Sequence, residues 1–466
     1  MQPTYEKLFE QNQSLLKQLN EALLEINQLK AEVRDLKDKL NTNSSNSSKS
    51  PSQDPFRDRK KSDKGSGRKQ GAQKGHPRHS RDLIPTEQVQ TLHDLKPDVC
   101  PDCQSNVFDK EIIGTEIRQV VELPEMPPEV IQYNIHTCRC SSCGKHVKAD
   151  IPNEAKYGFG PRLMGFITSL SGEFRMSKRQ VVALAGKIGI KICSGSVCKI
   201  HARASQILKN PYDEIKMCTL KQDHLNADET SWKTLAKTRW VWVGCCQDSV
   251  FFEIKSSRST RAFQEVFNGF KGGLTTDRYD AYNAHEGDRQ LCWSHADRDF
   301  EKIASREGFD KTVGEMLLQC KEAVFDLWHH FKDGIITRNE LIRKIEEGPK
   351  EDIRLLFKIG IAHEDCQSKT KATCKDFYNH FDMLWVFVYK ENIEPTNNLA
   401  EQGLRHGVIW RKLSYGTQSE VGERFVERVM TVAETLKRQA RNSFDYFTEC
   451  FREFIRGSHS PPVYAK

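Results

Sequence analysis

The sequence predicts a multidomain chain of the α+β class, 466 residues long. Three observations support this class. Residues 5–40 keep a strict seven-residue apolar repeat, two Cys-x-x-Cys pairs follow, and from residue 218 apolar runs with strand character alternate with helical segments. We expect eight segments, with the boundaries 1–41, 42–81, 82–152, 153–217, 218–300, 301–390, 391–440 and 441–466.

The composition limits the class of protein further. Charged residues make up 29% and hydrophobic residues 37% of the chain, and the net charge is +7. No run of 18 apolar residues occurs, so we expect no membrane span, and the N-terminus has no apolar core of a secretory signal. Fifteen cysteines without such a signal indicate reduced thiols and a cytoplasmic protein.

The N-terminal repeat predicts a coiled coil over residues 1–41. The two apolar positions hold Tyr5, Asn12, Leu19, Ile26, Val33 and Leu40, and Leu8, Leu15, Ala22, Leu29 and Leu36. Asn12 at a core position favours a fixed register and two strands. Self-association, as a homodimer or a higher oligomer, is the preferred interpretation, and a lone amphipathic helix packing on its own chain is the alternative.

Residues 42–81 form a polar linker that becomes strongly basic. Ten Lys or Arg stand between residues 57 and 81 against two Asp. A flexible basic arm suits the phosphate backbone of a nucleic acid, and a solvated linker is the alternative. The candidate DNA-binding residues here are Lys60, Lys61, Arg68, Lys69 and Lys74.

Residues 82–152 contain Cys100 and Cys103, then Cys140 and Cys143. Two Cys-x-x-Cys pairs can supply four thiolates to one structural Zn²⁺, with no position left for water. His136 and Cys138 are alternative ligands, but only Cys140 preserves the two-residue gap. The segment between the pairs alternates like strands, so we expect a small zinc-ribbon-like module.

Residues 153–217 predict helices around a turn at Gly189, which resembles a helix-turn-helix. Ser194 or Ser196 would be the N-cap of the second helix. Ser196, Lys199, His201 and Arg203 are then candidates for DNA contact, although any helical hairpin produces a similar pattern.

From residue 218 the pattern predicts a catalytic domain in two parts, 218–300 and 391–440. Strands are expected at 222–233, 239–247 and 249–256, a helix at 260–269, a strand ending at Asp277, a short helix capped by Asp280, and a strand in QLCWSHAD. This order is compatible with a ribonuclease-H-like sheet whose first three strands are antiparallel. Residues 301–390 read as an α-helical insertion, and 441–466 as a C-terminal helix and tail.

Three acids are candidates for one metal site. Asp228 and Glu229 lie side by side in the first strand, where acids are disfavoured, and must face opposite sides. Asp277 would approach Asp228 if their strands are neighbours. Glu401 shares a helical face with Asn397, Leu404 and Val408, after an N-cap at Thr396 or Asn397. Three carboxylates suit Mg²⁺ or Mn²⁺, whereas each acid alone would read as a surface or capping carboxylate.

Several motifs resemble the insertion-sequence 66 family of DDE transposases: ADET at Asp228, TTDRYDAY at Asp277, CWSHADRDF at His295, NNLAEQGLR at Glu401 and RKLSYGTQSEVGE at 411–423. The linker, basic arm and zinc module resemble it too. The chain departs from the family at Asp297 and Gln402, where the family usually has Arg.

The resemblance implies a bacterial, nucleoid-associated enzyme that cleaves insertion-sequence ends and joins them to target DNA. Two divalent ions would be held by Asp228, Asp277 and Glu401. Its DNA partners would be the terminal inverted repeats and the target, with accessory proteins of the element as further candidates. The resemblance adds candidate DNA contacts at His295, Arg298, Arg405, Arg411 and Lys412. Two alternatives stay open: a catalytically inactive zinc-containing DNA-binding regulator, and a nuclease that cuts without joining.

Overall fold

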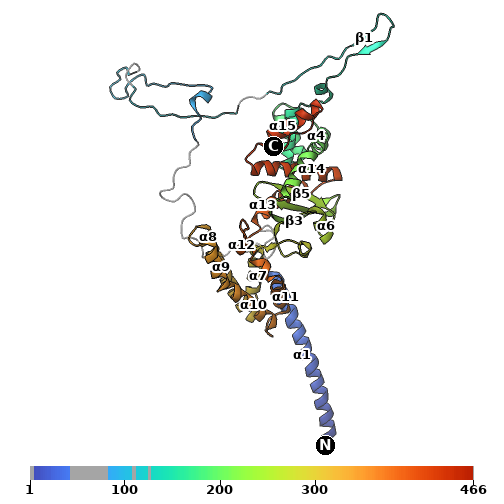
Figure 1. Cartoon of the computed structure of the whole chain (residues 1–466), viewed down its shortest axis with the longest axis vertical. Coiled ribbons are helices and arrows are strands. Elements are labelled where there is room, and N and C mark those ends of the chain that lie inside the picture. Colours follow the sequence, from blue (N-terminus) through green and yellow to red (C-terminus); the bar gives the residue numbers. More distant parts are fainter. Residues whose placement is uncertain (1–4, 42–81, 108–111, 124–126, 465–466) are drawn as a thin grey trace. The chain divides into compact units, whose positions relative to one another are not determined.

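The structure is a computed structural model that describes residues 5–41, 82–107, 112–123 and 127–464 (Figure 1). The chain divides into two units, residues 1–55 with 130–466, and residues 56–129. The expected basic arm, with Lys60, Lys61, Arg68, Lys69 and Lys74, lies outside the described residues.

The N-terminal segment is one long helix, α1 (Tyr5–Asn41). This confirms the helix that the seven-residue repeat predicts. Core positions of the repeat, among them Leu15, Leu19, Leu29 and Leu36, are exposed to solvent along it. An apolar stripe of this length needs a partner surface, so self-association stays a prediction.

The unit 56–129 contains little regular structure among its described residues, with one short 3-10 helix, η2 (Thr86–Gln88). The strands that we expected between the two cysteine pairs are wrong for the described residues from 112 to 136. Ile113 and Val120 are almost fully exposed there, so their alternation with polar residues reflects no buried sheet face.

Beyond residue 130 a small antiparallel hairpin, β1 (Thr137–Arg139) with β2 (His146–Lys148), carries the second cysteine pair. After η3 (Asn153–Lys156), four helices follow: α2 (Pro161–Gly172), α3 (Lys178–Lys187), α4 (Ser194–Ile207) and α5 (Lys209–Thr219). The turn at Gly189 is confirmed, with φ of 79°. The N-cap of α4 is Cys193, so the predicted cap at Ser194 or Ser196 is wrong.

A five-stranded mixed sheet in the order β5-β4-β3-β6-β7 forms the centre of the catalytic domain. The first three strands are antiparallel, as expected, and β6 and β7 run parallel to β3. The strands are β3 (His224–Thr234), β4 (Lys237–Cys245), β5 (Val250–Lys255), β6 (Gly273–Thr276) and β7 (Arg289–Leu291). A mixed sheet with helices on both faces is consistent with a ribonuclease-H-like domain.

Two details of this region differ from the prediction. The strand expected in QLCWSHAD ends at Leu291, and helix α7 (Trp293–Ala304) begins two residues later. Asp280 does not cap the next element, because it is the first residue of η4 (Asp280–Ala284) and the N-cap is Tyr279.

The two faces of the sheet pack on different helices. Val243 and Phe252 belong to the core shared with α2, α4, α13 (Asn398–Ser414), α14 (Glu420–Arg438) and α15 (Ser443–Arg456). Trp242 and Phe251 point to the opposite face, where α6 (Thr260–Val266) and η4 cover the sheet. Asp228 pairs with Val243 and Glu229 with Trp242, so the two acids occupy opposite faces.

Helix α14 closes the edge of the sheet beside β5. Thr435 Oγ1, Thr431 Oγ1 and Glu427 Oε1 accept the N–H groups of Val250, Phe252 and Ile254 at 3.2, 3.0 and 2.6 Å. The three helical residues are four apart and therefore form one stripe, which matches every second N–H of the strand. An edge that would otherwise present free N–H groups is thereby satisfied.

Residues 301–390, which we expected to form an α-helical insertion, are mostly helical. The helices are α8 (Phe309–Lys332), α9 (Arg338–Glu346), α10 (Pro349–Ala362), α11 (Ser368–Asn379), η5 (Phe381–Leu384) and α12 (Val386–Tyr389). With α7 they enclose their own hydrophobic core, which includes Phe300, Phe357 and Phe377. In Figure 1 these helices gather apart from α14 and α15.

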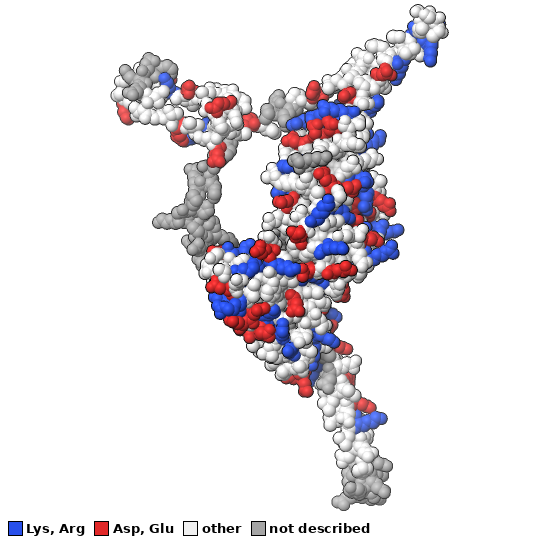
Figure 2. Space-filling model, in the orientation of Figure 1, with Lys and Arg blue, Asp and Glu red and all other residues white. Residues whose placement is uncertain are grey.

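Lys and Arg are interspersed with Asp and Glu over the face drawn in Figure 2. In the described parts of the chain, none of the helices combines the length and apolar character that a bilayer crossing requires.

Candidate active site

The site is built on the sheet face that α13 covers. The parallel register pairs Asn226 of β3 with Thr275 of β6, so Asp228 and Asp277 each stand two residues beyond a matched pair, on the same face. Asp277 follows the last residue of β6 directly. Its Oδ1 accepts the N–H of Tyr279 at 2.9 Å, and Asp228 Oδ1 accepts the N–H of Glu229 at 2.8 Å.

Helix α13 brings Glu401 to this face, and Asn397 anchors the start of the helix on β3. The Asn397 amide donates to the carbonyl of Ala227 at 2.8 Å and accepts from Asn226 at 2.9 Å. Its backbone N–H donates to Cys292 Sγ at 3.1 Å. Asn397 is fully buried, so these bonds set the distance between the Glu401 helix and the strand that carries Asp228.

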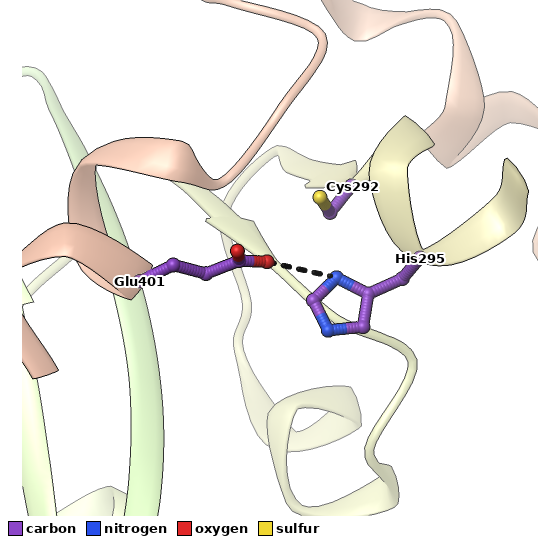
Figure 3. A group of neighbouring side chains, drawn as sticks. All are labelled: Cys292, His295 and Glu401. Atoms are coloured by element: carbon purple, nitrogen blue, oxygen red, sulfur yellow. Dashed lines mark ion pairs between the residues drawn. The ribbon is translucent and has the colours of Figure 1, made fainter. Parts of the chain in front are cut away.

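The Glu401 carboxylate lies beside His295 and Arg298 (Figure 3). Its Oε1 is 3.6 Å from His295 Nδ1 and 3.6 Å from Arg298 Nη2. Cys292, His295 and Glu401 place one ligand atom each within 4.8 Å of one another, and no group that includes Asp228 and Asp277 is that close among the described residues. Both Glu401 Oε1 and His295 Nδ1 are buried without a hydrogen-bond partner in this arrangement.

Burial raises the pKa of all three acids. For Asp228 burial is the largest cause, and the negative charges of Glu229, Asp277 and Glu401 raise its pKa further, well above the usual range. Burial also raises the pKa of Asp277, against the opposing effect of Tyr279 N–H and Arg289, and that of Glu401, against Arg298 and Arg405. Carboxylates that repel one another, one with an unsatisfied oxygen, fit a hard divalent cation.

A buried arginine, Arg289 on β7, fixes the loop that carries Asp277. Its Nε donates to Thr276 Oγ1 at 2.8 Å and its Nη2 to the carbonyl of Asp277 at 2.7 Å. Its Nη1 donates to Asn283 Oδ1. Arg289 is 4% exposed, and burial lowers its pKa to about 10, which leaves it charged at neutral pH.

Arg278, next to Asp277, connects the site with the insertion. Its guanidinium donates to Asp299 Oδ2 of α7 at 2.5 Å and to Asp376 of α11, and it stacks over Phe377. Arg278, the residue after Asp277, therefore connects the candidate site with α7 and α11.

Glu229 occupies the opposite face, as strand alternation predicts. The hydroxyl of Tyr282 donates to its Oε2 at 2.5 Å, and Arg258 Nη1 is 3.9 Å from its Oε1. The Arg258 guanidinium is itself stacked between Trp240 and Tyr279.

The predicted DNA contacts differ in their accessibility. His201 is stacked on Phe425 and 9% exposed, so its predicted availability to DNA is wrong. Arg203 lies over Tyr157, and Arg411 donates to the carbonyl and hydroxyl of Ser231. Three predicted contacts, Lys199, Arg405 and Lys412, are exposed.

The two cysteine pairs share one local geometry. The N–H of Cys100 donates to the carbonyl of Ser105 at 2.9 Å, and the N–H of Cys140 to that of Lys145 at 2.8 Å. In each turn the residue after the second cysteine has a positive φ: 59° for Gln104 and 71° for Gly144. Each pair by itself therefore forms a tight turn with two thiols, and four such thiols are a donor set that fits zinc.

A mixed sheet of this order, with Asp228 on β3, Asp277 directly after β6 and Glu401 on α13, is consistent with the ribonuclease-H-like domain of a DDE transposase. The model of the family described as "Transposase IS66 family" matches residues 160–424, more than half of the chain. The chain belongs to this family.

Two further family models match the N-terminal part. Residues 97–144, which include all four cysteines of the two pairs, match the "zinc-finger binding domain of transposase IS66". Residues 2–82 match a "Family of unknown function". No curated protein matched the chain.

The sequence did not predict that Arg278, Arg289 and Cys292 belong to the site. It also did not predict that Asn397 connects the Glu401 helix with β3. The Cys-x-x-His spacing of Cys292 and His295 was the one signal in the sequence that indicates their proximity, because residues three apart share a helical face.

Proposed function

We propose that this transposase cleaves DNA at the ends of its insertion sequence and joins those ends to target DNA, with Asp228, Asp277 and Glu401 as the metal-binding catalytic acids. The observation that supports the proposal is the placement of three half-buried acids on one side of the sheet: Asp228 of β3, Asp277 directly after β6, and Glu401 of α13. Their charges interact strongly enough to raise the pKa of Asp228.

The acids would hold two divalent cations, Mg²⁺ or Mn²⁺. When bound, these cations activate a water or a 3′-hydroxyl as the nucleophile and stabilise the leaving oxygen of an in-line displacement. Asp228 stands on β3, which pairs with β6 before Asp277 and packs against α13, so it would be suited to share a cation with either of the other acids. The side chain of Glu401 would turn from His295 and Arg298 toward Asp228.

Other residues of the chain position these acids. Arg289 holds the Asp277 carbonyl, and Asn397 holds the Glu401 helix against β3. Arg298 and Arg405 flank Glu401 and offer positive charge to DNA phosphates near the acids. Lys412 is exposed further along α13 and would extend this contact.

The N-terminal segments would mediate self-association and add affinity for DNA. Cys100, Cys103, Cys140 and Cys143 would hold one structural Zn²⁺. The arm with Lys60, Lys61, Arg68, Lys69 and Lys74 would contact phosphates, and α1 would join two copies of the chain.

The test is cleavage and joining of DNA that carries the element's ends, in Mg²⁺. The wild type should nick this DNA, and Asp228→Asn should bind it without nicking. Failure of the wild type to nick, with binding intact, would favour the inactive regulator.

A second assay, with pre-cleaved ends, addresses the other alternative. The transposase should join such ends to a target, whereas a nuclease would only cut.

A further inference from the structure

Residues 174–212, around the α3–α4 turn, carry positive charge alone. Eight Lys or Arg occur there and no Asp or Glu: Arg175, Lys178, Arg179, Lys187, Lys191, Lys199, Arg203 and Lys209. Over the face drawn in Figure 2 the two signs are mixed. A stretch of 39 residues without an acid, in a chain with 64 acids, is a strong local asymmetry.

Three of the eight cations are engaged within the chain. Arg175 contacts His406, Arg203 lies over Tyr157, and Lys209 pairs with Asp213 at 2.6 Å. The other five, Lys178, Arg179, Lys187, Lys191 and Lys199, are exposed, and none of them forms an ion pair with another described residue.

The fold of α3 and α4 turns these five side chains outward. Val181 and Ala185 of α3 and Val197, Ile200 and Ala204 of α4 are buried in the main core. Ser177 and Gln180 form a capping box that starts α3, and the N–H of Ile190 donates to the carbonyl of Ala185 at 2.9 Å to close the turn. The hairpin therefore packs its apolar residues into the core and leaves the five cations exposed.

The chemistry of the outer side favours a nucleic acid over a protein partner. Protein interfaces use clustered large apolar or aromatic anchors, and Phe174 is the one large hydrophobic side chain exposed within residues 174–212. The exposed positions in the first half of α4 hold Ser194, Gly195, Cys198 and Lys199 instead. Small side chains let a helix approach a groove closely, and the flanking lysines suit phosphates.

We propose that the outer face of α3 and α4, made by Lys178, Arg179, Lys187, Lys191 and Lys199, is a docking surface for duplex DNA, with the first half of α4 in the major groove. This proposal rests on the proposed function, because it assumes that the transposase acts on DNA. In this proposal His201 and Arg203, which the sequence suggested, do not contact DNA. Lys199 is kept, and four further contacts are added: Lys178, Arg179, Lys187 and Lys191.

The test is DNA binding by the full chain without divalent metal, as a function of salt. Changing Lys178, Lys187 and Lys191 together to Gln, with Lys199 of α4 left in place, should weaken binding. It should also make the slope of log K against log salt shallower by up to about 2.7, at roughly 0.9 per lost phosphate contact. The matched control changes Lys209, Lys221 and Lys271, three exposed lysines outside the face, to Gln and should leave the slope nearly unchanged.

A single change, Lys199→Ala, tests the placement of α4. It should reduce the preference for element-end DNA over shuffled DNA roughly tenfold, as expected for one lost base contact. An unchanged slope in the triple variant would overturn the proposal, as would equally tight binding of polyglutamate through the same lysines. Because no metal is present, such a failure would leave wild-type cleavage, and hence the proposed function, intact.

Discussion

Arg289 illustrates how single residues define this site. A buried guanidinium is costly unless its donors are satisfied, and here they bind Thr276, the Asp277 carbonyl and Asn283. The positive charge also opposes the rise in the pKa of Asp277. Arg289 therefore both orients a candidate ligand and partly compensates the repulsion among the acids.

Replacing Arg289 should damage the site even though it touches no substrate. Arg289→Met removes the buried hydrogen bonds to Thr276, the Asp277 carbonyl and Asn283, which should cost about 1–3 kcal/mol of unfolding free energy. It should also weaken Mn²⁺ binding by roughly 10–100-fold, the usual effect of losing an outer-shell contact. Calorimetric titration of Mn²⁺ and thermal melting measure the two effects.

Arg289→Lys provides the control for geometry. Lysine keeps the charge but lacks the planar fork, so it should not restore Mn²⁺ affinity. Full affinity in the Lys variant would mean that charge alone matters at this position.

The sequence predicts the three candidate acids, but it does not predict the residues that position them. Asp228 stands out because an acid in a strand needs a reason, and strand alternation correctly separates it from Glu229. Asn397 and Arg289 act through contacts with residues far away in the chain, and no local pattern encodes such contacts.

Helix α14 satisfies the backbone N–H groups at the free edge of strand β5. Its stripe of Glu427, Thr431 and Thr435 binds alternate N–H groups of the edge strand β5. Glu427 is 1% exposed and its second oxygen, Oε2, pairs with Arg424 Nη1 at 2.8 Å. Burial raises the pKa of Glu427 to about 8, against the opposing effect of Arg424.

This shift predicts a pH dependence of stability. The carboxyl is protonated in the folded chain up to about pH 8, but in the unfolded chain only to its ordinary value of 4.5. Folding therefore takes up a proton between these pH values, and the unfolding free energy should fall as pH rises, by at most about 1.4 kcal/mol per unit.

Glu427→Gln should remove this slope, because the amide keeps an acceptor for Ile254 N–H without titrating. Urea unfolding at pH 5 and pH 8 measures the unfolding free energy. The stability of the variant relative to the wild type should increase as pH rises. Parallel curves for the two proteins would contradict the shifted pKa.

The element predictions failed where short patterns were ambiguous. QLCWSHAD contains the short apolar run of Leu291, Cys292 and Trp293, which suits a buried strand as well as a helix. The buried positions Trp293, Ala296, Phe300 and Ile303 have helical spacing, and this spacing becomes visible only beyond the eight residues of the motif.

Helix α1 carries a prediction of its own. Because its exposed leucines repeat every seven residues, deleting residues 1–41 should lower the mass of the protein in solution scattering. An unchanged mass would mean that another surface holds the assembly, or that the chain is monomeric with α1 present.

On the scale of the whole molecule, the two cysteine pairs and the match to the transposase family occupy separate parts of the chain. The match to the transposase family begins at residue 160, and the zinc-finger match ends at residue 144. Both cysteine pairs therefore precede the catalytic part, whose cores contain none of these four residues. Loss of the zinc should accordingly leave the catalytic fold intact.

The corresponding experiment changes Cys100 and Cys140 together to Ser. The double variant should lose its bound zinc, while the main thermal transition, which reports the three cores, stays within a few degrees of the wild type. Zinc retained at one ion per chain would reject these ligands and favour His136 or Cys138.

The most direct test of the central claim compares five variants in one cleavage and joining assay with Mg²⁺. Asp228→Asn, Asp277→Asn and Glu401→Gln should each abolish both reactions and retain DNA binding, because an amide keeps the shape but loses the charge that a hard cation requires. The matched controls are Glu229→Gln, on the opposite sheet face, and Asp280→Asn, which caps no helix, and both should keep most activity. An active Asp277→Asn beside an inactive Asp280→Asn would contradict the assignment of the second ligand, and full activity of Asp228→Asn would contradict the site as a whole.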